Sequence, residues 1–189
     1  MFANRSSSKR YADRLEAHFS PNLRRKLTLC FAVVAASCLQ ASFASRWQVF
    51  GMQANFLTAT AFGISIFCDM PGAALAGFTC GLILASVVSP PAGGFGAIIV
   101  STTLAAAGLG WMERRLFRDS ALLAAPLTLF ACLAASVLEF VISPQAGVAA
   151  YAAHAAGAAF LNAILAAPLH LSLRSFMGRQ PRRELQMAE

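Results

Sequence analysis

One acidic side chain lies well inside an apolar run of this sequence, and it is the first candidate for chemistry or binding. Glu139 lies near the end of the apolar run 120–142. A carboxylate in lipid costs a few kcal/mol, so such a residue is a candidate functional site. The alternative is that Glu139 lies within about one helical turn of the membrane surface and is hydrated. If it is buried, His154 and Arg46 are the nearest partners on its side of the membrane.

Two further polar residues lie in the last apolar run. His154 and Asn162 are eight residues apart, so they share one face of a helix. That face is suited either to line a pocket or to hydrogen-bond a neighbouring helix.

Other chemistry-bearing patterns are missing from the sequence. It contains no nucleophile–base pair, no metal-ligand spacing and no phosphate-binding loop. The five cysteines lie in apolar runs without a CxxC pair, which predicts neither disulfides nor a zinc site. We therefore expect no catalytic residue, no metal and no cofactor, and a protein that is not an enzyme.

The elements that hold these residues are predicted to be membrane helices. The chain is 58% hydrophobic and 12% charged, about half the charged fraction of soluble domains. Residues 70–112 contain no charge, which leaves room for two spans of about 20 residues each. Between them, Ser89–Gly94 is rich in proline and glycine and predicts a reversal. We expect this pair to be a helical hairpin around which the rest of the chain packs.

The whole sequence predicts an all-α membrane protein with six transmembrane helices. The expected spans are 27–45, 55–68 with part of the preceding turn, 73–88, 95–111, 120–142 and 148–171. They form a transmembrane domain over 27–173, between a basic segment at 1–26 and a basic tail at 174–189. Segment 1–26 is either an amphipathic surface helix or a disordered tail. A signal peptide cleaved near Ala44 is the less favoured alternative, because the basic region is long and five spans follow.

The positive charges indicate how the helices cross the membrane. Six spans place fourteen of the fifteen Lys and Arg residues on one side, and only Arg46 on the other. The positive-inside rule therefore predicts that both termini are cytoplasmic. The net charge of +7 gathers at the ends of apolar runs, which argues against nucleic-acid binding. The candidates to contact lipid or cytoplasmic partners are Arg24, Arg25, Lys26, Arg114, Arg115 and Arg118.

The third expected span carries a ridge of small residues. Ala73, Gly77 and Gly81 recur every four residues, so they share one helix face. Such a ridge lets another helix approach closely. The approaching helix belongs either to this protein, the favoured alternative, or to a partner.

Four short motifs resemble those of the MreD family of bacterial rod-shape-determining membrane proteins, over about residues 50–176. Gly51–Leu57 corresponds to a Gly-x-x-Pro-Asp stretch, with alanine and asparagine in place of proline and aspartate. Gly72–Leu82 resembles Gly-Ala-x-x-Gly-Phe-x-x-Gly-Leu, with one residue more before Gly77 and with a following aspartate replaced near Ala85. Pro91–Gly96 resembles a Pro-x-Gly-x-x-Gly turn. Leu161–Leu169 is similar to the closing Asn-x-x-x-x-x-Pro.

The resemblance implies a non-catalytic scaffold of the cell-elongation (rod) complex in the bacterial inner membrane, which helps to organise peptidoglycan synthesis and cell shape. Its implied partners are MreC, a single-span periplasmic protein, and through it MreB, RodA and a penicillin-binding transpeptidase. The family fold is similar to the substrate-binding subunits of energy-coupling-factor transporters. A vitamin- or metal-uptake subunit is therefore the alternative, and it requires an outward polar or aromatic pocket. The sequence offers few groups for one: Trp47, Gln53, Asn55, Glu139 and Tyr151.

Overall fold

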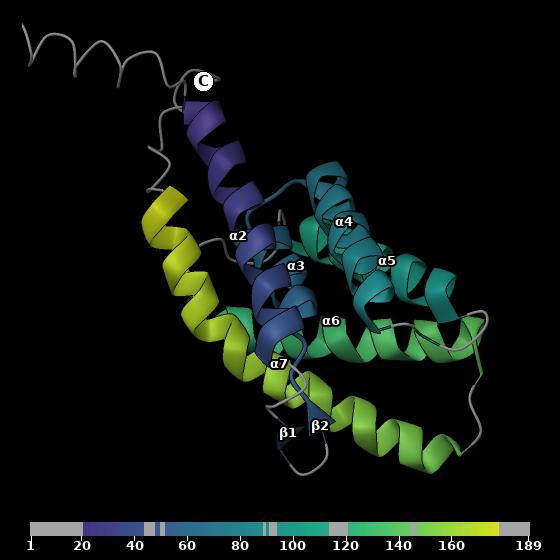
Figure 1. Ribbon diagram of the computed structural model, residues 1–189. Helices are drawn as coiled ribbons and strands as arrows, with labels where there is room; N and C mark the ends of the chain where they lie inside the picture. Colours follow the sequence, from purple (N-terminus) through teal and green to yellow (C-terminus); the bar gives the residue numbers. More distant parts are fainter. Residues whose placement is uncertain are drawn as a thin grey trace, which may run out of the picture.

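The computed structural model describes residues 21–43, 48–49, 52–88, 90, 94–113, 121–144 and 147–177. These residues form six helices and one short β-hairpin (Figure 1). In chain order the elements are α2 (Pro21–Phe43), β1 (Gln48–Val49), β2 (Met52–Gln53), α3 (Phe56–Ser65), α4 (Met70–Val88), α5 (Gly94–Glu113), α6 (Ala121–Ile142) and α7 (Val148–Met177).

Several predictions lie outside the described residues. They concern the amphipathic stripe before Pro21, the loop with Arg114, Arg115 and Arg118, and the side chains of Arg46 and Trp47. Arg24, Arg25 and Lys26 lie in the first turns of α2.

Four of the six helices are long and apolar enough to cross a membrane. They are α4, α5, α6 and α7, and they coincide with the last four expected spans. The prediction of a helical, multi-pass membrane protein is confirmed at this level. The apolar part of α2, Leu27–Phe43, is shorter, and α3 has only ten residues. Ten residues of helix reach about 15 Å, half of a bilayer core.

The region expected to form the second span is only partly helical. Its first part forms the antiparallel hairpin β1–β2, in which Gln48 pairs with Gln53. Asn55 then fixes the start of α3, because its side chain accepts a hydrogen bond from the Thr58 N–H at 3.0 Å. This uncharged run thus forms a hairpin and a short helix, because the Asn55 N-cap places the start of the helix at Phe56.

The short helix α3 lies in the middle of the bundle (Figure 1) and contacts all five other helices. Eight of its ten residues are buried, and Phe62, Leu57 and Ile64 are among the largest fully buried side chains. Protein therefore surrounds α3 on its sides. The centre of the fold is therefore α3, whereas the sequence indicated the hairpin of α4 and α5.

Helices α4 and α5 pack along one another more extensively than any other pair. A Cβ added to Gly77 would lie 2.5 Å from the Ala106 Cβ and 2.8 Å from the Thr102 carbonyl oxygen. One turn away, a Cβ on Gly81 would lie 3.2 Å from the Ile99 Cα. We call this contact the α4–α5 seam. Its members are Ala73, Gly77 and Gly81 on α4 and Ile99, Thr102, Ala106 and Gly110 on α5.

The other face of α4 is apolar and open. Leu75 is 66% exposed and Phe78 is 45% exposed. Large apolar side chains without protein contacts are typical of a lipid-facing surface. The small-residue ridge is thus occupied by α5, and the face left for lipid or a partner carries large side chains.

Candidate binding pocket

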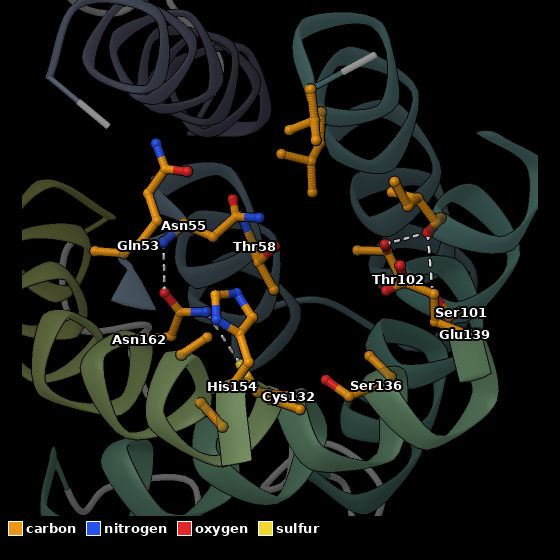
Figure 2. A pocket seen from close by; sticks show the side chains of 18 of the residues that line it. Gln53, Asn55, Thr58, Ser101, Thr102, Cys132, Ser136, Glu139, His154 and Asn162 are labelled. Atoms are coloured by element: carbon orange, nitrogen blue, oxygen red, sulfur yellow. Dashed lines mark hydrogen bonds between the residues drawn. The ribbon is translucent and has the colours of Figure 1, made fainter. Parts of the chain in front are cut away.

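A polar pocket of about 250 Å³ lies at one end of the bundle. At this end α2, α4 and α6 finish, α5 and α7 begin, and β2 leads into α3. The hairpin strand β2 and all six described helices contribute lining residues. In Figure 2, Gln53, Asn55 and Asn162 lie on one side, Ser101, Thr102 and Glu139 lie on the other, and His154 lies between them.

One group of polar residues around this pocket is committed to holding the fold together. The Asn162 Oδ1 accepts a hydrogen bond from the Asn55 N–H at 2.8 Å. The Asn162 Nδ2 donates to the Cys132 Sγ at 3.6 Å. Because Asn162 is on α7 and Cys132 on α6, this buried amide joins three parts of the chain. An amide paired in this way stabilises the fold and has little capacity left for a ligand.

The first turn of α3 needs such partners because its N–H groups have no carbonyl within the helix. The Phe56 N–H donates to the Gln40 Oε1 at 2.8 Å. Gln40 is 6% exposed and belongs to α2. The N–H groups of Asn55, Phe56 and Thr58 are thus satisfied by side chains from α7, from α2 and from the cap residue itself. This arrangement allows a helix to begin deep in the protein.

Three hydroxyl groups are also used locally. The Tyr151 Oη donates to the Ser136 carbonyl oxygen at 2.9 Å, and its ring lies 5.2 Å from the Phe140 ring. The hydroxyls of Ser101 and Thr102 donate to the Ile98 carbonyl oxygen within α5. Tyr151 therefore ties α7 to α6.

A second set of polar side chains lines the pocket without such commitments. Their own side-chain polar atoms form no hydrogen bond or ion pair with another described residue, although the backbones of Thr58 and Ser136 do. We call them the open groups: Gln53, Thr58, Ser136, Glu139 and His154. They come from β2, α3, α6 and α7. They supply a carboxylate, an imidazole, an amide and two hydroxyls, all facing one cavity.

The predicted site residues separate into two places. Glu139, His154 and Asn162 all line the pocket, while Ala73, Gly77 and Gly81 lie in the α4–α5 seam. Glu139 is partly buried and shares the pocket with His154, one of its two expected partners, without a hydrogen bond or ion pair between them.

The sequence analysis missed several polar pocket residues, namely Gln40, Thr58, Ser101, Thr102, Cys132 and Ser136. Gln40 could have been identified from the sequence, because an amide inside an apolar run needs a hydrogen-bond partner. The serines and threonines had none, since such hydroxyls can bond to their own helix anywhere. The estimate that few groups were present for a pocket was therefore too low.

A buried histidine at the other end of the bundle was also missed. His170 is 3% exposed and stacks on Phe67, with ring centroids 4.7 Å apart. Its Nδ1 has no hydrogen-bond partner among the described residues. His170 lies in α7, four residues before Arg174, so the sequence placed it near a solvated helix end.

Within the described part of the chain, no three His, Cys, Asp or Glu side chains gather as a metal site. The pocket instead offers hydrogen bonds and one carboxylate. Comparisons with protein-family models, curated proteins and solved structures found no match.

Proposed function

We propose that this protein is a non-catalytic membrane scaffold of the bacterial cell-elongation complex, of the MreD type. It binds MreC and, through it, helps to organise MreB, RodA and the transpeptidase. The proposal starts from the four sequence motifs and from a helical bundle with several long apolar helices.

One observation supports this proposal most directly. The first and last motifs of the resemblance are more than one hundred residues apart, yet they meet in space. The N–H of Asn55, in the first motif, donates to the Oδ1 of Asn162, in the last, at 2.8 Å. Asn55 also caps α3 at the position where the family pattern has aspartate, and both residue types are good N-caps. This contact is consistent with two motifs that act together in one fold.

The second motif has a packing role that fits the same proposal. Gly77 and Gly81 are two of the glycines of this motif, and both lie against α5. Large exposed side chains on α2, α6 and α7 then provide apolar surface for a partner's transmembrane helix, among them Phe31, Phe130 and Phe160. Such binding uses shape and packing, and requires no reactive group.

The proposed topology has six passes and both termini in the cytoplasm. The short helix α3 counts as a pass because α2 ends and α3 begins at the pocket end, and α4 starts at the other end. Extended backbone at membrane depth is tolerated where protein encloses it. In this topology the pocket opens to the periplasm, and the basic segments lie in the cytoplasm.

Affinity purification from native membranes tests the scaffold proposal. A tag is placed at the C-terminus, and mass spectrometry identifies the co-purifying proteins. We expect a single-span periplasmic coiled-coil protein together with elongation synthases. Their absence under conditions that retain other membrane complexes would contradict the proposal.

The polar pocket favours a second candidate, a substrate-binding subunit of an energy-coupling-factor type uptake transporter. Five open groups in a cavity of about 250 Å³ exceed what helix packing requires. The same purification separates the two candidates. A pair of ATPases with a coupling membrane subunit would identify the transporter.

A further inference from the structure

We infer that the polar pocket binds a small solute that carries an ammonium group and hydrogen-bonding groups. This inference deepens the second candidate function, because it names the ligand class of the same pocket. It does not depend on whether the chain also binds MreC.

The division of polar groups in the pocket is the first step. Asn162, Gln40 and Tyr151 are hydrogen-bonded to protein atoms, so they hold the walls in place. The five open groups are held on these fixed walls and have no partner among the described residues. Gln53, Thr58, Ser136 and Glu139 are partly buried, and His154 is exposed. Five polar side chains without a protein partner thus face one open cavity, where they are available to hydrogen-bond a polar solute.

Charge decides which occupant fits. Among the described residues of the lining, Glu139 is the only acidic side chain and there is no Lys or Arg. An anionic solute would face this carboxylate without a Lys or Arg among the described lining residues to compensate for it. An ammonium group next to Glu139 forms a charge-assisted hydrogen bond, about twice as strong as a neutral one. The hydroxyl of Ser136, three residues before Glu139 on α6, offers a second acceptor for the same group.

The opposite wall suits the other end of the solute. Gln53 and Thr58 lie across the pocket from Glu139 (Figure 2). They offer amide and hydroxyl groups that both donate and accept. A cavity of about 250 Å³ holds roughly eight water molecules. This space suits an amino sugar or a short diamine, and is too small for a large cofactor.

The test uses two sets of probes matched in size and different in charge. The first set is glucosamine, glucose and glucuronate. The second is putrescine, 1,4-butanediol and succinate. Binding to the full-length protein in detergent is measured by isothermal titration calorimetry and by the shift in melting temperature. We expect at least one amine to bind, and its neutral and acidic counterparts to bind roughly tenfold more weakly or not at all.

Two variants assign the binding to the pocket. Glu139→Gln keeps the shape and removes the charge, so it is expected to weaken amine binding roughly tenfold or more. Leu75→Gln lies on the exposed face of α4 and is the matched control, with unchanged binding. Size-exclusion profiles establish that each variant is folded.

Three results would overturn the inference. They are no binding of either amine, equal binding of the neutral or acidic counterparts, and unchanged binding to Glu139→Gln. A photo-crosslinker at position 139 that captures MreC while both amines fail to bind would assign the open groups to a protein partner. That last result would leave the scaffold proposal standing and remove this inference, so the two fail separately.

Discussion

The α4–α5 seam and the polar pocket use their residues in opposite ways. The seam uses small residues to bring two helices together, and the pocket uses polar residues around an open space. In the seam, Gly77 and Gly81 remove side chains so that two helices touch, and no space remains. In the pocket, side chains from the six described helices and β2 stop short of one another and leave about 250 Å³. The seam is expected to be sensitive to size and insensitive to charge. The pocket is expected to be sensitive to side-chain charge and insensitive to side-chain size.

Gly77→Leu should have the largest effect. Its Cβ alone would lie 2.5 Å from the Ala106 Cβ and 2.8 Å from a backbone oxygen. The helices must therefore separate, at a cost of about 3 kcal/mol or more. We expect loss of the monodisperse peak in size-exclusion chromatography.

Gly108→Leu is the matched control for Gly77→Leu. Gly108 is exposed on α5, and a Cβ there meets no atom within 4 Å. The control should elute like the wild type. Equal loss of folded protein in both variants would contradict the close packing of the seam.

Asn162→Ala should have the next largest effect. It leaves the Asn55 N–H without its acceptor and removes the bond to Cys132. An unsatisfied buried donor costs about 1–3 kcal/mol, which thermal unfolding in detergent will report as a lower melting temperature. His154→Ala, two turns earlier on α7, breaks no hydrogen bond among described residues and serves as the control. If the two variants melt alike, the bridge from α7 to α3 does not stabilise the fold.

Substitution of the open groups should have the smallest effect on stability. Glu139→Gln and Gln53→Ala remove no side-chain bond within the described residues. We expect the free energy of unfolding to change by less than about 0.5 kcal/mol. A large loss in Glu139→Gln would mean that its carboxylate holds the fold, and that the pocket is not divided into committed and open groups.

The long helices were predictable because long uncharged runs have few alternatives in a membrane protein. The runs ending at Val88, Trp111 and Ile142 became α4, α5 and α6 with ends shifted by a few residues. The ridge of Ala73, Gly77 and Gly81 was visible from its spacing, since helical spacing fixes a face. Its partner helix was not, because the sequence does not say which helix lies opposite.

The centre of the fold could not be predicted from hydropathy. An uncharged run reads the same whether lipid or protein surrounds it, so 47–68 was expected to supply a full span. Its replacement by β1–β2 and α3 depends on bonds from Gln40 and Asn162, which are distant in sequence. Long-range polar contacts of this kind leave no local pattern. For the same reason Thr58 and Ser136 could not be assigned to the pocket.

Labelling of single cysteines in intact cells tests the central claim most directly, namely that a water-accessible pocket faces the side opposite the termini. The five native cysteines are replaced by alanine, and a membrane-impermeant maleimide is added from outside. We predict labelling of Ser136→Cys in intact cells, labelling of Gln180→Cys only after permeabilisation, and no labelling of the lipid-facing Leu75→Cys. Labelling of Gln180→Cys in intact cells, or protection of Ser136→Cys until the cells are permeabilised, would contradict the account.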